Sequence, residues 1–213
     1  MSPLHLGLLG IVLIFLIAML EVGVIESAYH KLGMSHRAVT LLLLLSIFGS
    51  YINIPIASIS APIVHQNIYN LIYIPAIRPS PDDTIIAVNL GGAVIPVLLS
   101  AYLLIRVGGL LPAFIATVLV ALLVHHFAHI IPGAGIAVPI FIPGLAAAIL
   151  AILLSRERRP VVAYVAGTIG CLVGADVLNL PLVAHLNAPI ASIGGAGTFD
   201  GVFVSGIVAV LLA

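Results

Sequence analysis

The chain has very little charge and no tryptophan: Lys, Arg, Asp and Glu together make up 7% of its 213 residues. Hydrophobic residues account for 62%. This composition leaves too few polar side chains to cover the surface of a water-soluble domain. The formal net charge is zero, so the chain lacks the basic surplus typical of a nucleic-acid-binding protein. We therefore expect a membrane protein that contacts lipids and no nucleic acid.

Cysteine is almost absent as well. The single Cys171 excludes an internal disulfide and a multi-cysteine metal site. It lies within an apolar run, where we interpret it as a small packing residue. The composition indicates no cofactor, and zinc at a group of histidines is the one exception that we consider.

Long apolar runs fill most of the chain. A helix needs about 20 mostly apolar residues to cross about 30 Å of hydrocarbon, and it satisfies its own backbone hydrogen bonds there. The sequence predicts an all-α fold, a polytopic helical membrane protein with a single transmembrane domain over residues 1–213. The seven predicted spans are Leu4–Glu26, Ala38–Ile56, Thr84–Ile105, Leu110–Ile131, Ile136–Leu154, Val161–Leu182 and Ile190–Leu212. Residues 57–83 form a proline-rich external segment that is interfacial or re-entrant.

Basic residues gather on one side of these spans. With the N-terminus outside, six of the seven fall in cytoplasmic loops: Lys31, Arg37, Arg106, Arg156, Arg158 and Arg159. Such a bias orients membrane proteins, so we predict a multi-pass protein of the cell membrane with its C-terminus in the cytoplasm. The first span lacks a basic leader and a small-residue cleavage site, and we interpret it as a retained helix. Glu21 and Glu26 at its cytoplasmic end are then solvated or paired with Lys31 or Arg37.

Two stretches of the chain resemble each other. Ser50-Tyr51-Ile52-Asn53-Ile54-Pro55 is similar to Asp176-Val177-Leu178-Asn179-Leu180-Pro181, and each is followed by a glycine pair and a helix. The pairs are Gly91-Gly92 and Gly194-Gly195. We predict a parallel pseudo-repeat in which the second and third spans correspond to the sixth and seventh, an arrangement known in transporters.

Asp176 and Asp200 lie inside the sixth and seventh predicted spans. A carboxylate at membrane depth costs about 2.5 to 3.5 kcal/mol, so it usually faces a protein interior or a wet cavity. Both are predicted about 9 Å from the outer ends of neighbouring antiparallel helices. Two close carboxylates in a low dielectric share one proton, so one can act as a base toward water and the other as an acid. Alternatively, each aspartate satisfies a broken helix end.

Polar residues and glycines near the aspartates form the predicted substrate-binding set: Asn53, Asn89, Asn179, Ser192, Gly194, Gly195 and Thr198. The Asn-x-Pro segments would break a helix, because proline lacks an N–H group. Glycine pairs at a helix start expose backbone amides that attract anions or polarise a carbonyl. Helix termination at the outer interface and close helix packing are the simpler explanations of the same features.

Three histidines, His125, His126 and His129, lie near the outer end of the fourth span. On a helix, spacings of three and four residues would put His129 on a face shared with the other two. With an aspartate added they could bind zinc, whose catalytic sites use about three protein ligands and one open position. The alternative is that they are amphipathic residues of a helix end, because the glutamate of the His-Glu-x-x-His pattern is missing.

Two glycine-aspartate stretches carry a family resemblance. Gly174-Ala175-Asp176-Val177-Leu178-Asn179-Leu180 and the run from Ser192 to Gly201 resemble a prokaryotic membrane family known as domain of unknown function 1614. Asn89-Leu90-Gly91-Gly92-Ala93 and Pro132-Gly133-Ala134-Gly135-Ile136 look like its other motifs. The resemblance implies a polytopic membrane protein and brings no assigned activity.

A weaker resemblance is to intramembrane aspartyl proteases of the presenilin and signal-peptide-peptidase type, which place one aspartate on each of two adjacent helices. Gly197-Thr198-Phe199-Asp200 has phenylalanine where their motif has glycine, and Ala175 stands where they have tyrosine. This resemblance implies intramembrane peptide hydrolysis.

Three functions follow as hypotheses. The first is an intramembrane diaspartyl hydrolase acting on a membrane-embedded peptide or a lipid-linked group, with Asp176 and Asp200 as catalytic residues. The second is a transporter of a cation, proton-coupled solute or small polar molecule, in which the aspartates bind the ion or proton. The third is a non-catalytic membrane scaffold.

Overall fold

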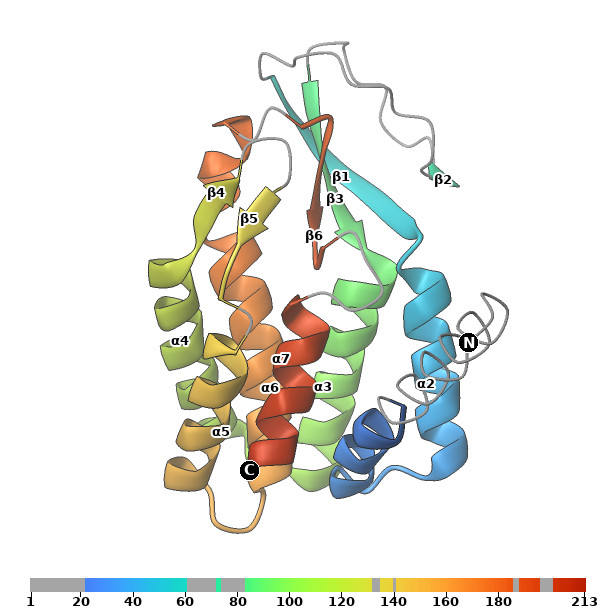
Figure 1. The fold of residues 1–213 in the computed structure, drawn as a ribbon, viewed down its shortest axis with the longest axis vertical. Coiled ribbons are helices and arrows are strands. Elements are labelled where there is room, and N and C mark those ends of the chain that lie inside the picture. The colour runs from blue at the N-terminus through green and yellow to red at the C-terminus, as the bar shows by residue number, and fades with distance from the viewer. Residues whose placement is uncertain are drawn as a thin grey trace, which may run out of the picture.

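The computed structural model describes residues 22–60, 72–73, 83–131, 135–139, 141–185, 188–195 and 201–213. Most of the first predicted span and most of the external segment 57–83 lie outside these residues. The described chain is mostly helical, as predicted, and a small sheet stands at one end of the helices (Figure 1).

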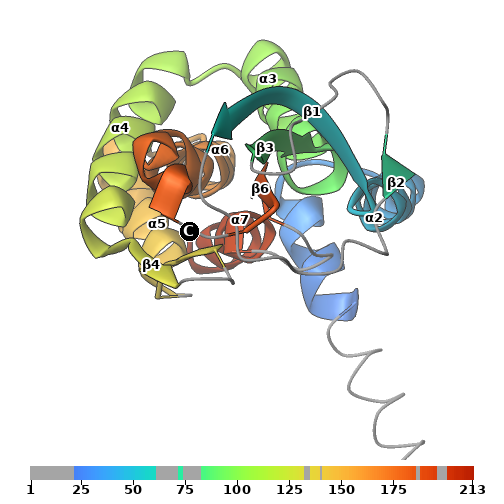
Figure 2. The same cartoon turned by 90° about the horizontal axis from the view of Figure 1, so that it is seen from above.

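Most of the described helices run along the long axis of the molecule, whereas the first is strongly inclined to it (Figure 2). The helices are Val22–Lys31, α2 (His36–Gly49), α3 (Ile95–Val107), α4 (Leu110–Phe127), α5 (Ile142–Leu154), α6 (Arg159–Cys171) and α7 (Gly201–Leu212). A π-helical turn, Leu90–Val94, leads into α3, and a second one, Leu172–Val177, extends α6. A 3-10 helix, Leu180–His185, follows.

Helix α6 is the centre of the bundle. Figure 2 shows it surrounded by α3, α4, α5 and α7, and every residue from Val161 to Thr168 is buried. Its small residues permit close approach: a Cβ added at Gly167 would lie 2.9 Å from the Ser205 carbonyl oxygen of α7. Small residues at helix contacts are typical of membrane bundles, where packing rather than the hydrophobic effect holds helices together.

The outer surface of the bundle is strongly apolar. On α4 the buried face consists of small residues such as Ala113 and Ala116, whereas Leu111, Phe114 and Leu122 are 69%, 64% and 57% exposed. A water-soluble bundle would bury its largest apolar side chains instead. The surface is therefore the kind that contacts lipid.

Three described helical segments are long and apolar enough to cross a membrane: Leu90–Val107, Leu110–Phe127 and Arg159–Val177. Val22–Lys31 and α2 add a fourth if the pair, bent by 119°, is one broken span. Helices α5 and α7 are shorter apolar helices. These helices indicate a membrane protein.

The sheet has four strands in the order β2 (Ile72–Tyr73), β1 (Ile52–Ser60), β3 (Asp83–Asn89) and β6 (Ile190–Ile193). Strands β1 and β3 are antiparallel with Asn53 opposite Asn89, whereas β3 and β6 are parallel. The β1–β3 register shifts between Pro55 and Ala57, because proline cannot donate to a ladder and is tolerated at such a bulge. A separate hairpin pairs β4 (His129–Ile131) with β5 (Gly135–Ala137).

The strands were not predicted, and they replace the outer ends of the predicted spans. The second span becomes α2 followed by β1, the third begins as β3, and the seventh begins as β6. The fourth and fifth spans contribute β4 and β5 in the same way. The replaced ends are rich in isoleucine, whose branched side chain suits strands. An apolar run without charges does not distinguish these strands from helix.

The loops that carry most basic residues lie together at the end opposite the sheet, where α3 meets α4, α5 meets α6, and α7 ends (Figure 1). The Lys31 ammonium donates to the carbonyl oxygens of Val210 and Leu211 at 3.3 and 2.9 Å. A cation at the C-terminus of α7 satisfies carbonyls that have no partner within the helix. We call this the basic end.

Candidate functional site

Asn53 of β1, Asn89 of β3 and Ser192 of β6 come together within the sheet. The Asn89 side-chain amide donates to the Asn53 Oδ1 at 3.2 Å and to the Ser50 carbonyl oxygen at 2.8 Å. The Ser192 hydroxyl lies 2.6 Å from the same Asn53 Oδ1 and 2.9 Å from the Gly195 carbonyl oxygen, and its single proton serves one acceptor at a time. The sequence prediction had grouped these three residues, and the fold joins them.

Two glycine pairs meet where β3 and β6 end. The Gly92 N–H donates to Asn89 Oδ1 at 2.7 Å inside the first π-helical turn. A Cβ added at Gly92 would overlap the Gly194 carbonyl oxygen, and one added at Gly194 would lie 2.7 Å from Ala93 Cβ. Gly194 and Gly195 also have φ of +85° and +73°, which other residues rarely adopt. Close backbone contact thus explains both pairs.

Asp176 belongs to the second π-helical turn and is partly buried. Its Oδ2 accepts the Gly194 N–H at 2.7 Å, so a carboxylate from the turn that extends α6 binds the backbone of the loop that leads to α7. Such turns inside helices occur often at functional sites. A backbone hydrogen bond to a carboxylate is also among the stronger kinds of hydrogen bond.

Asn179 has a different environment. Its side-chain amide donates to the carbonyl oxygens of Gly174 and Ala175, both at 2.9 Å, and the residue is 3% exposed. It therefore satisfies the end of the π-helical turn, as expected where a helix stops before proline. Its predicted role in substrate binding stays a prediction, as do those of Asn53, Asn89 and Ser192.

Asp200 and Thr198 lie outside the described residues, in the segment 196–200 before Gly201 begins α7. Helices α6 and α7 run antiparallel (Figure 1), with Gly206 against Tyr164 and Thr168. Counting along each helix at about 1.5 Å per residue, the start of α7 comes within about one turn of the level of Asp176. The distance between the two carboxylates is not described, and the acid pair stays a prediction.

The histidines do not share the predicted helical face. His125 and His126 are exposed in the last turn of α4, which ends at Phe127, whereas His129 begins β4. His129 Nδ1 lies 3.3 Å from the Phe127 carbonyl oxygen, and the His126 ring packs edge-on against Phe127 with ring centroids 5.3 Å apart. Zinc binding by these histidines stays a prediction. The helical spacing no longer supports it, because His129 lies outside α4.

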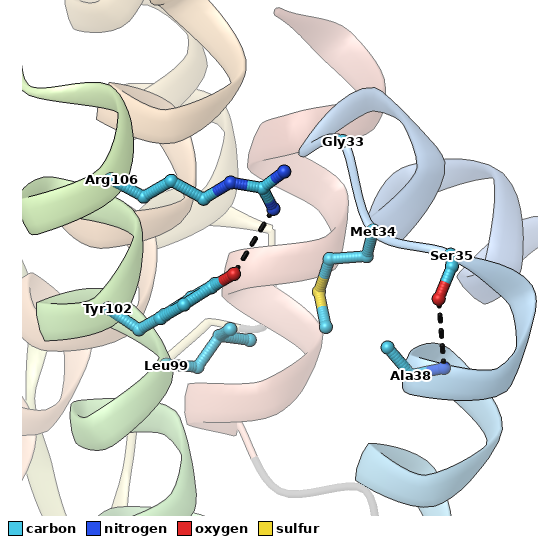
Figure 3. Close-up of a pocket in the computed structure, with 7 residues that line it drawn as sticks. All are labelled: Gly33, Met34, Ser35, Ala38, Leu99, Tyr102 and Arg106. Carbon is cyan, nitrogen blue, oxygen red and sulfur yellow. Dashed lines mark hydrogen bonds between the residues drawn. The ribbon is translucent and has the colours of Figure 1, made fainter.

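A pocket opens at the basic end, between α3 and the turn before α2 (Figure 3). Its volume is about 410 Å³, and its lining consists of Gly33, Met34, Ser35, Ala38, Leu99, Tyr102 and Arg106. Arg106 donates to the Tyr102 hydroxyl oxygen at 3.2 Å (Figure 3). This pocket was not predicted, because its two walls come from segments about 65 residues apart in the sequence that no shared motif connects.

Comparison with family models finds one match, described as "Protein of unknown function (DUF1614)", over residues 47–212. The chain belongs to this family. The DUF1614 match includes Asp176, Asp200 and both glycine pairs, so it confirms the resemblance read from those motifs. No curated protein and no solved structure matches the chain. The likeness to intramembrane aspartyl proteases therefore rests on the aspartate motifs alone.

Proposed function

We propose that this DUF1614 protein is a multi-pass protein of the cell membrane, with the sheet outside and the basic end in the cytoplasm. The grouping of basic loops opposite the sheet supports this orientation, since positive loops stay on the cytoplasmic side. The N-terminus is then outside and the C-terminus inside.

Maleimide labelling in intact cells tests the orientation. In a Cys171→Ser background, Glu157→Cys on the loop before α6 should resist a membrane-impermeant maleimide until the membrane is permeabilised. Tyr51→Cys, on the exposed turn before β1, should react in intact cells. The reverse pattern would invert the orientation.

The activity that we propose is hydrolysis by Asp176 and Asp200 within the membrane, at a peptide bond or a lipid-linked acyl group. The hydrogen bond from Gly194 to Asp176 carries this proposal, because it ties one carboxylate to the loop that leads to the other. The start of α7 near the level of Asp176 supports it further. The predicted contacts with substrate come from Asn53, Asn89, Asn179, Ser192, Gly194, Gly195 and Thr198.

In such a reaction the ionised carboxylate takes a proton from water while the water oxygen bonds to the substrate carbonyl carbon. The protonated carboxyl donates its proton to the carbonyl oxygen, giving a neutral tetrahedral intermediate. Collapse of the intermediate breaks the bond to the leaving nitrogen or oxygen, which receives a proton from the first aspartate. One hydroxyl of the intermediate returns its proton to the second aspartate as it becomes the carbonyl of the product acid. The pair returns to its single shared proton.

Disulfide trapping tests the geometry without a known substrate. The double variant Asp176→Cys, Asp200→Cys in the Cys171→Ser background should form an internal disulfide with copper phenanthroline, since bonded cysteines need Cα atoms within about 7 Å. The matched control pairs Asp176→Cys with Glu157→Cys, at the other end of α6. If neither cysteine pair formed a disulfide, the proposal that Asp176 and Asp200 form an acid pair would be contradicted.

A photoreactive peptide with a hydroxyethylene isostere, which mimics the tetrahedral intermediate, tests the chemistry. The purified wild-type protein and Glu157→Gln should be labelled, whereas Asp176→Asn and Asp200→Asn should lose labelling while remaining folded. Labelling that is equal in all four proteins would contradict hydrolysis.

A transporter is the second candidate, favoured by one specific observation. Strands β3 and β6 are parallel, and each leads through a glycine pair into an apolar helix. Parallel repeats with interrupted helices are typical of transporters that bind substrate between the repeats. Proton flux into proteoliposomes that Asp176→Asn abolishes, together with absent peptide labelling, would favour transport. If neither assay depends on the aspartates, the scaffold hypothesis takes precedence.

A further inference from the structure

We propose that Glu26, His30 and His36 bind a transition-metal ion, Zn²⁺ in the first instance, at the basic end of the bundle. The site lies at the opposite end of the bundle from the sheet and is independent of the function proposed for Asp176. All three residues precede the part of the chain that matches the family model, 47–212. The site is therefore a property of this chain rather than of the family motifs.

The bend between two helices assembles the three side chains. Glu26 and His30 are four residues apart on the helix Val22–Lys31, so they share a face. The chain then turns by 119° into α2, which returns His36 to the same side. The three ligand atoms all lie within 4.8 Å of one another. His30 Nε2 is 3.1 Å from Glu26 Oε1, and His36 Nδ1 contacts that same oxygen.

The hydrogen bonds of His30 indicate a cation in this group. His30 Nδ1 lies 2.9 Å from the Met34 carbonyl oxygen. A carbonyl only accepts, so Nδ1 carries the hydrogen, and a neutral ring then has a lone pair on Nε2. That lone pair faces a carboxylate oxygen, which is also only an acceptor. Either a second proton or a metal ion must lie between them.

A bound metal ion explains the three side chains better than hydrogen bonds from the two rings to Glu26. Histidines that bind metals usually donate their other ring N–H to a carbonyl or carboxylate, as His30 does to Met34. Two imidazole nitrogens and one carboxylate oxygen form a recurrent zinc set with a fourth position for water. The competing arrangement places a ring N–H group of each histidine on one carboxylate oxygen, with hydrogen on both nitrogens of His30 only.

The surroundings allow an ion to enter and be held. The side chains of His30 and His36 are 47% and 74% exposed, whereas that of Glu26 is 24% exposed. The ammonium of Lys31, the single lysine of the sequence, donates to the carbonyl oxygens at the end of α7. An ion would join the helix Val22–Lys31 to α2 and fix the turn whose residues Gly33, Met34 and Ser35 line the pocket (Figure 3).

Zinc titration of the full-length protein in detergent tests the proposal. The protein carries a tag without histidines and is first stripped with a chelator, and a chromophoric chelator then reports the competition for Zn²⁺. The wild type should bind a single ion per chain, and Co²⁺ in its place should give visible absorption of a four-coordinate site. Glu26→Gln, His30→Gln and His36→Gln should each lower the affinity at least about tenfold.

Controls separate this site from the other histidines. His125→Gln, His126→Gln and His129→Gln, made together, should leave the affinity unchanged. Zinc should also raise the unfolding temperature of the wild type and not that of His36→Gln, because only a folded-state ligand stabilises. The absence of zinc binding by the wild type would overturn the proposal, and so would binding that survives in His36→Gln and disappears in the triple variant.

Discussion

The chain contains two strand–glycine–helix units, and they provide different acceptors for a glycine N–H group that follows the strand. In the first, β3 passes through Gly91-Gly92 and a π-helical turn directly into α3, and the Asn89 carboxamide accepts the Gly92 N–H. In the second, β6 ends at glycines with positive φ, and the described part of α7 begins at Gly201. There the acceptor for a glycine N–H is the Asp176 carboxylate, supplied by another helix.

The two acceptors, the Asn89 carboxamide and the Asp176 carboxylate, differ in what they can do chemically. Asn89 uses both donors and its oxygen on Ser50, Asn53 and Gly92, so the first unit is a closed set of bonds. An amide cannot exchange a proton near neutral pH, whereas a carboxylate can. The second unit thus holds a group capable of acid–base chemistry where the first holds a neutral one. Substitutions at four positions test this contrast.

The largest effect is expected where the two units touch. Gly194→Ala places a Cβ 2.7 Å from Ala93 Cβ at a φ of +85°. Strain and overpacking together should destabilise the fold by at least about 3 kcal/mol. Thermal unfolding in detergent measures the loss. Gly23→Ala, which meets no atom within 4 Å, is the matched control and should be neutral or slightly stabilising. Equal unfolding temperatures would show that the contact does not matter.

Asn89→Ala should cause the second largest loss of stability. It leaves the Gly92 N–H and the Ser50 carbonyl without their partner at a site that is 0% exposed. An unsatisfied buried polar group costs about 1 to 3 kcal/mol, and denaturant midpoints in mixed micelles measure it. Thr40→Ala removes an exposed hydroxyl from α2 and should change stability by less than about 0.5 kcal/mol. A loss no larger than that of Thr40→Ala would contradict the closed set of bonds.

Two substitutions of Asp176 should have different effects on stability and on activity. Asp176→Asn keeps an oxygen for the Gly194 N–H, so the unfolding midpoint should stay close to that of the wild type while peptide labelling is lost. Asp176→Ala removes that acceptor and should cost about 1 to 2 kcal/mol. Both variants are compared by unfolding and by labelling with the same peptide. Unfolding of Asp176→Asn as severe as that of Asp176→Ala would make the carboxylate structural.

Ser192→Ala should have the smallest effect. The Asn53 Oδ1 loses one donor and keeps Asn89, so the expected cost is about 0.5 to 1 kcal/mol. The control is Ser58→Ala, an exposed serine on β1. A loss above that of Asn89→Ala would show that Ser192, and not Asn89, holds the strands together.

Much of the site was accessible from the sequence. Glycine pairs, asparagines and an aspartate in apolar surroundings are costly unless they have partners, so Asn53, Asn89, Ser192 and Asp176 could be selected from their setting. The register between them could not, because it depends on strands that the predicted spans treated as helix. Asp200 remains a prediction from sequence.

The proposed zinc ligands Glu26, His30 and His36, in contrast, could not be selected as a group from the sequence. Glu26 and His30 are readable as a pair on one helix, but His36 joins them only because the chain bends by 119° after Lys31. The sequence interpretation took Glu26 for a helix-end residue that is solvated or paired with Lys31 or Arg37. In the histidine group that was predicted, the end of α4 at Phe127 moved His129 off the helix.

The sequence by itself determined the membrane character, the mostly helical class, the basic loops and the motifs of the family, because each depends on which residues are present and how they follow one another. Tertiary structure decided where each apolar run changes from helix to strand, which glycines touch, and which side chains face one another. Those outcomes depend on partners distant in the chain: β3 becomes a strand because β1 and β6 supply its hydrogen bonds. Local hydrophobicity is the same with or without those partners.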